Sequence, residues 1–304
     1  MTAPRRRRAS WVSYLLLVLL AAIWSSSFMV IKVTVVTLPP LTLTAVRLLV
    51  AAVMLAVVLG MTSERLPRGG RVWAMCVLIG FFGNALPFTL IGWGETQIAS
   101  SQAAILMAVM PLATVLLAHF FSDGERATRY GLTGIAIGFG GVVVLMGPSA
   151  LHGTGSDIWH QLAVSGGAVS YAVSAVIARN LPPSSVLGRS VAVMMCATAM
   201  MLPAALLIDQ PLGLTPASEA IWGAVYLGVL PTGIATLIYF RLIGAEGAGF
   251  FSYINYLIPV MGVFWGASLL AERVSLQAVL ALVMILSGLF VANYRPKRDR
   301  HANA

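Results

Sequence analysis

The chain has 304 residues, of which 59% are hydrophobic and only 10% are charged, whereas an average soluble domain is about 25% charged. So few charged side chains cannot cover the surface of a water-soluble fold, and the composition excludes a soluble globular protein. The net charge of +9 does not indicate a nucleic-acid partner, because the basic residues fall in alternate loops between apolar segments instead of on one face.

Apolar segments recur along the whole chain, with lengths near the roughly 20 residues that a helix needs to cross a membrane. The sequence therefore predicts an all-α integral membrane protein with ten transmembrane helices. The expected spans, in chain order, are residues 11–33, 43–59, 72–91, 99–121, 130–146, 158–177, 190–208, 220–239, 247–270 and 276–291.

The first two spans contain polar residues within apolar surroundings. Trp24 begins a polar interruption of the first span that ends at Ser27, and such small residues serve either close helix packing or the lining of a solute path. Lys32 lies near the end of the first span and Arg47 about one turn into the second, so the turn between them places both at the same depth. Either their side chains extend to the lipid headgroups, which we favour, or they attract a carboxylate group of a solute.

The later spans carry further polar residues, with the densest group directly before Pro259 in the ninth span. An asparagine in hydrocarbon needs a partner on another helix or a water-filled cavity, so we expect Asn255 to face the interior of the bundle. Helix packing is the alternative role at each of these positions. We predict a substrate path lined by Trp24, Ser27, Lys32, Arg47, Asn84, Gln102, Ser170, Tyr171, Ser174, Thr232, Tyr253, Asn255 and Tyr256.

No pattern in the chain indicates catalysis. The two lysines, Lys32 and Lys297, do not stand in the phosphate-binding motif of nucleotide hydrolases. His119 lies within an expected span, and no catalytic or metal-ligand cluster can be assembled around it. We therefore expect no enzymatic activity, no cofactor and no metal.

The two halves of the chain are related in sequence. The block from Pro111 to Gly141 aligns with the block from Pro259 to Gly288 with one residue extra, and "AAIWSSSFMVIK" aligns more weakly with "GAVSYAVSAVIA". We therefore expect a first repeat at residues 12–146 and a second at 158–293, each of five helices. Because five is an odd number, the second repeat enters the membrane inverted, as in transporters that bind their solute between two repeats.

Sixteen of the 19 basic residues fall in alternate loops and in the two tails, whereas the other loops carry Arg273 alone. By the positive-inside rule, both termini are expected in the cytoplasm. The sixteen are Arg5 to Arg8, Arg65, Arg68, Arg71, Arg126, Arg129, Arg179, Arg189, Arg241, Arg295, Lys297, Arg298 and Arg300.

Gly134 and Gly138 stand four residues apart in the fifth span, a spacing that lets two helices approach closely. We favour packing of this face within the bundle over dimerisation. The expected oligomeric state is a monomer or a weak homodimer.

The chain resembles the ten-helix drug/metabolite transporters built from two EamA domains, over residues 12–293. Three motifs carry the resemblance: "WSSSFMVIK…LPPLTLTAVRLL", "MPLATVLLAHFFSDGERATRYGLTGIAIGFGGVVVL" and "IPVMGVFWGASLLAERVSLQAVLALVMILSGLFV". The resemblance implies a multi-pass protein of the cytoplasmic membrane that exports small polar metabolites, with amino acids, aromatic ones included, as the expected solute. Its partners would be a small-molecule solute and membrane lipid, with no nucleic acid. The alternatives are transport of a purine or sugar derivative, or a non-transporting scaffold or lipid scramblase.

No acidic residue stands in the middle of an expected span, and Glu95, Glu246 and Glu272 come closest. A carboxylate within the membrane is the usual proton relay and the usual counter-charge of a cationic drug. The sequence therefore favours a neutral, zwitterionic or anionic solute whose transport is not coupled to protons. The alternative is that one of these three side chains reaches inward and titrates.

Overall fold

The computed structural model describes residues 9–121, 128–147, 157–182 and 184–294. Every regular element in these ranges is a helix, which confirms the predicted all-α fold. Nine of the described helical segments are long and apolar enough to cross a membrane, and a shorter apolar helix at Ile254–Leu269 makes a tenth segment.

In the first half, five spans are built from single or interrupted helices. These are α1 (Trp11–Thr34), α2 (Pro40–Gly60), a third span of α3 (Gly70–Gly80), the π-helix η1 (Phe81–Ala85) and α4 (Leu86–Glu95), a fourth span of α5 (Ser100–Met107) and α6 (Val109–Phe121), and α7 (Arg129–Met146).

The second half repeats this plan, including a third span that is interrupted by a π-helix. Its elements are α9 (Asp157–Arg179), α10 (Val186–Ile208), a third span of α11 (Ser218–Leu227), the π-helix η3 (Gly228–Ile234) and α12 (Ala235–Phe251), then α13 (Ile254–Leu269) and α14 (Leu276–Asn293). A short 3₁₀ turn, Pro211–Gly213, lies between α10 and α11.

Several predicted boundaries differ from the structure, most of all around α12. The eighth span was expected to end at residue 239, but α12 continues to Phe251 across a bend at Gly247, whose φ is +82°. Glycine adopts this backbone conformation without a steric penalty, so the chain turns there and the ninth span begins at Ile254 instead of residue 247.

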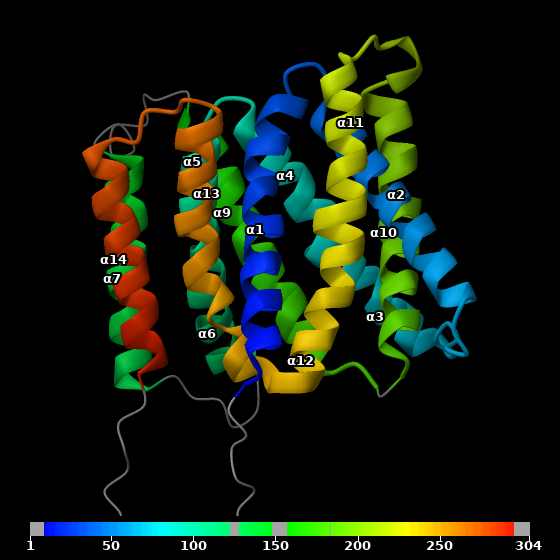
Figure 1. The fold of residues 1–304 in the computed structure, drawn as a ribbon, viewed down its shortest axis with the longest axis horizontal. Helices are drawn as coiled ribbons and strands as arrows, with labels where there is room; N and C mark the ends of the chain where they lie inside the picture. The colour runs from blue at the N-terminus through cyan, green and yellow to red at the C-terminus, as the bar shows by residue number, and fades with distance from the viewer. Residues whose placement is uncertain (1–8, 122–127, 148–156, 183, 295–304) are drawn as a thin grey trace, which may run out of the picture.

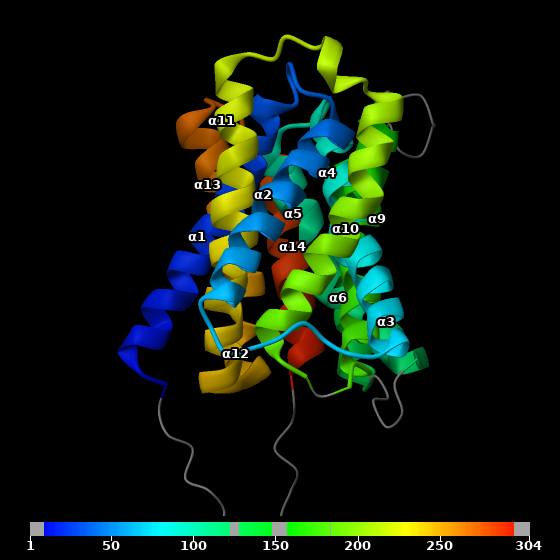
Figure 2. The same cartoon turned by 90° about the vertical axis from the view of Figure 1, so that its right-hand side faces the viewer.

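Figures 1 and 2 place the start of α1 and the end of α14 at the same end of the bundle, which we call the terminal face. The other end, where α1 ends and α14 begins, is the opposite face. Helix α1 is the first span and α9 is the sixth, so α1 leaves the terminal face whereas α9 runs toward it. The second half is therefore inverted relative to the first.

Polar contacts between the halves fix the ends of α2 and α10, which pack side by side. Asp209, just after α10, accepts hydrogen bonds from the backbone nitrogen and the hydroxyl of Thr42 at 2.7 and 2.8 Å, in the first turn of α2. Reciprocally, the hydroxyl of Ser185, the residue that caps α10, donates to Glu64, which follows α2. Each acidic group thus lies at the amino end of a helix from the other half, where negative charge is stabilising.

The glycines of the fifth span pack α7 against α14 and α6. A Cβ atom at Gly134 would lie 2.3 Å from the carbonyl oxygen of Gly288, and one at Gly138 would lie 2.1 Å from Leu112. Figure 1 shows α7 and α14 side by side at one edge of the molecule. The close-packing face predicted from the spacing is thus occupied inside the bundle.

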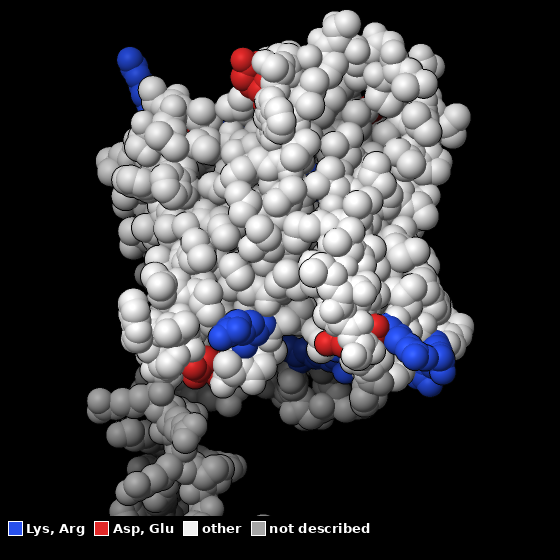
Figure 3. All heavy atoms as spheres, turned by 45° about the vertical axis from the view of Figure 1, so that its right-hand side comes forward, with Lys and Arg blue, Asp and Glu red and all other residues white. Residues whose placement is uncertain are grey.

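Apart from Lys32, Arg47 and Arg273, the described basic residues lie toward the terminal face, where Figure 3 shows a band of Lys and Arg side chains. They lie in the α2–α3 loop and near the ends of α7, α9, α10 and α12, whereas Arg273 precedes α14 at the opposite face. The tail residues, Arg126 and the glutamate before it lie outside the described residues. The expected orientation rests on this unequal distribution of basic residues between the two faces. The orientation itself stays a prediction.

Candidate substrate cavity

A cavity of about 360 Å³ lies in the centre of the bundle and is lined by both halves. Its volume falls in the range of roughly 300–1,000 Å³ that is typical of small-molecule sites. The first four spans of each half contribute lining residues, whereas α7 and α14 contribute none of those described. The lining reaches Ile254 near the terminal face and stops at Ile31 and Ile91, short of the opposite-face ends of α1 and α4.

The two π-helices form facing parts of the wall. Gly83 and Asn84 of η1 and Pro231 and Thr232 of η3 all line the cavity. Proline has no backbone N–H, so Pro231 cannot donate the α-helical hydrogen bond to the carbonyl oxygen of Leu227. The hydroxyl of Thr232 donates to that oxygen at 2.8 Å. Such π-turns inside helices are frequent at functional sites.

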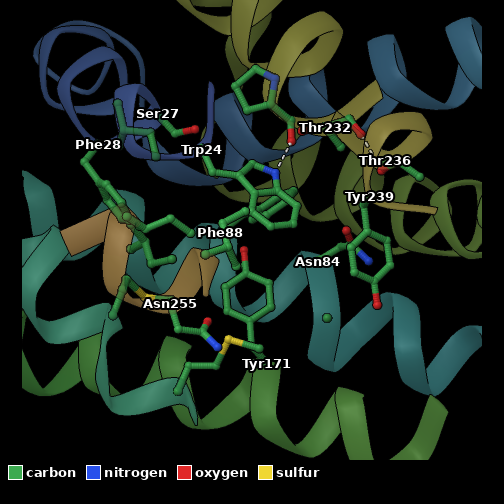
Figure 4. A pocket seen from close by; sticks show the side chains of 18 of the residues that line it. Trp24, Ser27, Phe28, Asn84, Phe88, Tyr171, Thr232, Thr236, Tyr239 and Asn255 are labelled. Atoms are coloured by element: carbon green, nitrogen blue, oxygen red, sulfur yellow. Dashed lines mark hydrogen bonds between the residues drawn. The ribbon is translucent and has the colours of Figure 1, made fainter. Parts of the chain in front are cut away.

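The first span of each half supports the π-helix of the other. The indole nitrogen of Trp24 donates to the carbonyl oxygen of Pro231 at 3.0 Å, a bond drawn in Figure 4. The hydroxyl of Ser170 donates to the carbonyl oxygen of Phe82 at 2.7 Å. Trp24 and Ser170 stand at the same position when the two first spans are aligned, so the two bonds are equivalent in the two halves.

The three serines after Trp24 have separate roles. Ser25 accepts a hydrogen bond from the indole of Trp265 at 2.9 Å, and Ser26 shares one with the hydroxyl of Tyr226 at 2.7 Å. Ser27 lines the cavity. Two of the serines therefore pack helices together, and the third forms part of the cavity wall.

Arg47 is buried at the cavity wall with 7% of its surface exposed. Its Nε donates to the hydroxyl of Thr232 at 2.8 Å, and its guanidinium carbon lies 3.7 Å from the centre of the Phe88 ring. Within the part of the chain that the structure describes, no hydrogen bond from its two terminal nitrogens to a protein acceptor is found. The headgroup interpretation is therefore wrong for Arg47, whose charge faces the interior.

Lys32 has a different role, at the edge of the opposite face. Its ammonium donates to the backbone carbonyl oxygens of Glu95 and Ile98, each at 2.8 Å. These oxygens lie at the carboxyl end of α4 and in the turn after it, where a cation is stabilising. Lys32 thus joins α1 to the α4–α5 turn instead of extending to the headgroups, and it is not part of the cavity lining.

Seven of the thirteen residues predicted for the substrate path lie together in the lining: Trp24, Ser27, Arg47, Asn84, Tyr171, Thr232 and Asn255. Figure 4 shows Trp24, Tyr171 and Asn255 directed toward one space from three helices.

Six predicted residues lie away from the lining and make other contacts. Besides Lys32, Ser170 supports η1, and Ser174 packs against Gly83, where a Cβ atom would lie 2.4 Å from its hydroxyl. The hydroxyl of Tyr256 accepts a hydrogen bond from Asn293 at 3.4 Å. Gln102 is partly buried on α5, and Tyr253 is 57% exposed.

Besides Trp24 and Tyr171, the wall contains aromatic residues that sequence reasoning missed: Phe28, Phe88, Tyr239 and Phe251. Tyr239 packs against Trp24 and Phe251, with ring centres 6.2 and 4.8 Å away respectively, and all three line the cavity. Phe88 lies under Arg47. The available signals were the two prolines: Phe88 follows Pro87 directly, and Tyr239 stands two helical turns after Pro231.

Several proteins of similar sequence align with this chain over almost its whole length. A probable terminal-alkyne amino-acid exporter of Streptantibioticus cattleyicolor is 28% identical over 283 residues, which is 92% of this chain and 92% of that protein. The uncharacterised inner membrane transporter YedA of Escherichia coli K12 is 27% identical over 266 residues, 87% of this chain and 85% of that protein. The uncharacterised transporter YoaV of Bacillus subtilis is 21% identical over 285 residues, 91% and 95% of the two chains.

The fold is also found in a crystal structure. That protein superimposes with a TM-score of 0.66 at 20% sequence identity, over 94% of this chain and 98% of its own. The sequence profile of the EamA-like transporter family matches residues 11–147 and again residues 158–294. With two such domains around one central cavity, the chain belongs to the EamA-like transporter family and is a multi-pass membrane transporter.

Proposed function

We propose that this transporter exports amino acids, those with apolar or aromatic side chains included, by alternating exposure of the central cavity to the two faces. The observation that carries the proposal is the buried guanidinium of Arg47, which is the one Lys or Arg side chain among the described lining residues. No Asp or Glu belongs to that described lining. The cavity wall therefore carries one positive charge without a matching negative charge.

A carboxylate is the group that satisfies such a guanidinium. Thr232 fixes Nε and Phe88 holds the plane of the group, so the two terminal nitrogens remain for a solute. Two parallel N–H donors match the two oxygens of a carboxylate, and this geometry is specific to arginine. In this proposal Arg47 binds the carboxylate group of the solute.

The remaining wall suits the other parts of an amino acid. Trp24, Tyr239 and Phe251 provide aromatic faces, which attract an ammonium group and also pack against apolar side chains. Asn84 and Asn255 supply amide oxygens that accept hydrogen bonds from an ammonium.

Export and orientation form the second part of the proposal. The excess of basic residues at the terminal face supports a cytoplasmic location of both termini, and the E. coli relative is an inner membrane transporter. The cavity lining reaches the ends of α12 and α13 at that same face, so a solute would enter from the cytoplasm. The name of the relative from Streptantibioticus, a probable terminal-alkyne amino-acid exporter, also supports export of amino acids.

Counterflow in proteoliposomes tests the solute class. Vesicles are loaded with unlabelled phenylalanine, and uptake of labelled phenylalanine, leucine, adenine or a sugar is measured. We expect exchange of the two amino acids but not of phenylalanine amide, which lacks the carboxylate. Arg47→Gln should raise the concentration for half-maximal exchange by roughly 10- to 100-fold, the value of a charged hydrogen-bond pair.

Two controls make the result interpretable. Arg47→Lys keeps the charge but loses the planar pair of donors, so it should restore only part of the exchange. Exchange of adenine or of the sugar in place of the amino acids would contradict the proposal and favour another metabolite. A membrane-inserted protein that exchanges none of the panel, but moves labelled lipid between leaflets, would support a scramblase.

A further inference from the structure

Glu95, the last residue of α4, is enclosed by the protein. Its exposed surface is 0%, and among the described residues neither carboxylate oxygen has a hydrogen-bond partner. It is the one acidic side chain with this property in the described part of the chain. A buried carboxylate without a hydrogen bond carries a large free-energy cost when it is charged.

The other two carboxylates near the ends of spans are fully used. Glu246 accepts hydrogen bonds from the backbone nitrogen of Ser10 and the hydroxyl of Ser13. Glu272 accepts from the backbone nitrogen and hydroxyl of Ser100 at 2.8 Å, and from the nitrogen of Ser101 at 2.9 Å. Both therefore have structural partners for a negative charge, which Glu95 lacks.

The nearest cation does not satisfy Glu95 either. Lys32 binds the backbone carbonyl oxygen of Glu95 instead of its carboxylate. The charged groups that act on Glu95 are Lys32 of α1, Arg47 of α2 and Glu272 in the loop after α13. Helix α9 adds two ionisable rings beside α4, namely His160 against Trp93 and Tyr171 against Phe88. Helix α5 carries no ionisable side chain.

Glu95 also lies on the face of α4 that leads to the cavity. Phe88, Ile91 and Glu95 follow each other at intervals of three and four residues, which is one face of a helix. Phe88 and Ile91 line the cavity, whereas Glu95 lies one turn beyond them toward the opposite face. The link of Lys32 to Glu95 and Ile98 lies at the same level. A motion that opens the opposite face would therefore expose Glu95 to water.

We propose that Glu95 is a proton-binding site, and that a proton must occupy it before the opposite face can close. The proton adds to a carboxylate oxygen from water at that face while it is open, and the neutral acid is then enclosed. On reopening, the proton returns to the same side. Proton binding thus sets the rate of transport without moving protons across the membrane. The inference rests on the proposed alternating access, but not on the identity of the solute.

The rate of phenylalanine counterflow is measured at equal pH on both sides, from pH 5 to pH 8. For the natural chain the rate should fall as pH rises, by up to about tenfold per pH unit where closure limits the cycle. Glu95→Gln, which is always neutral, should give a rate that does not fall. Glu246→Gln, whose carboxylate is bonded at the terminal face, is the matched control and should keep the natural slope.

A second measurement reports on opening without any solute. Ile98→Cys places a thiol at a position 2% exposed, and Gln97→Cys places one at the exposed neighbouring position, both in a chain without Cys76 and Cys196. The labelling rate of the cysteine at 98, divided by that at 97, should rise severalfold from pH 5 to pH 8. Glu95→Gln should remove this rise.

The outcomes separate the two proposals. Counterflow that is present but has the same pH dependence in Glu95→Gln overturns the proton site and leaves the transport proposal intact. Absence of counterflow at every pH contradicts the proposed function, while the labelling ratio still tests the proton site. Accumulation of phenylalanine driven by a pH gradient alone would show that the proton crosses the membrane and would overturn the one-sided site.

Discussion

At the scale of single residues, Arg47 is held by a relay of two hydrogen bonds. The hydroxyl of Thr232 accepts from Arg47 and donates to the carbonyl oxygen of Leu227. A hydroxyl can do both at once, so one side chain orients the arginine and also satisfies the backbone that Pro231 disrupts. Thr232 is thus a positioning residue for the proposed carboxylate site.

Thr232→Val should weaken solute binding through Arg47. Losing both hydrogen bonds is worth about 1–3 kcal/mol, so we expect the half-saturating concentration of phenylalanine in counterflow to rise roughly 5- to 100-fold. Thr232→Ser keeps the hydroxyl and should restore the natural value. Thr236→Val is the matched control, because it removes a hydroxyl from the same wall that bonds only the backbone of Thr232. An equal loss in that control would refute the positioning role.

Glu272 gives the fold a pH dependence at the opposite face. Burial alone would favour its neutral form, but the hydrogen bonds from Ser101 and Ser100 outweigh this and hold the pKa of Glu272 below its ordinary value. A lowered pKa means that its stabilising effect is complete above the ordinary pKa and is lost as pH falls through the lowered one.

The natural chain and Glu272→Gln should therefore differ in thermal stability at neutral pH and converge in acid. Unfolding in detergent, followed by helical circular dichroism between pH 3 and pH 7, measures this difference. A difference in thermal stability that stays constant down to pH 3 would show that the charge of the Glu272 carboxylate does not stabilise the start of α5.

At the scale of elements, the α7–α14 pair is joined through glycine backbones. A Cβ atom at Gly134 would meet the oxygen of Gly288 at 2.3 Å and the nitrogen of Ala292 at 2.4 Å, so neither neighbour is a side chain that can move away. A Cβ atom at Gly140, on the same helix, would meet only the flexible end of Met284 at 3.4 Å.

Gly134→Ala should destabilise the protein by about 1–3 kcal/mol, the usual cost of overpacking, whereas Gly140→Ala should be neutral or slightly stabilising, because alanine is the better helix former. The temperature of aggregation in detergent compares the two. Since α7 and α14 do not line the cavity, the residual folded Gly134→Ala protein should keep its affinity for solute, and a changed affinity would contradict that separation.

The elements show where sequence reasoning succeeds and where it stops. The ten apolar segments are visible in the sequence because each is a long run of apolar residues. Among the described residues nine of them form helices long and apolar enough to cross a membrane, and the shorter apolar helix α13 corresponds to the tenth. The π-helices cannot be recognised in the sequence, because a turn with one extra residue does not interrupt the run of apolar residues. The end of α12 was placed too early because Arg241 and Glu246 lower the local hydropathy, although both remain helical.

At the scale of the whole molecule, orientation is the prediction with the widest consequence. Tags at both ends should be protected from protease in intact cells and become accessible only after lysis, because the excess of basic residues lies on their side. A tag in the loop after Arg273 should behave in the opposite way. Cleavage of the terminal tags in intact cells would reverse the proposed direction of solute entry.

The candidate site could be predicted only in part, because depth in the membrane follows from sequence but rotation about the helix axis does not. Asn255 and Tyr253 are two residues apart, yet one lines the cavity and the other is 57% exposed. The side chain of Arg47 was expected to extend to the headgroups, but its inward direction follows from Thr232 and Phe88, which lie far away in the sequence.

The reciprocal bonds of Trp24 and Ser170 have a consequence for how the polypeptide can be divided. Each half supplies the donor that the interrupted helix of the other half requires, so an isolated half would keep unsatisfied carbonyl groups in lipid. Two fragments, 1–147 and 157–304, nevertheless contain every bond described here. Synthesised together, they should complement each other and restore counterflow, whereas either fragment alone should be degraded in the membrane.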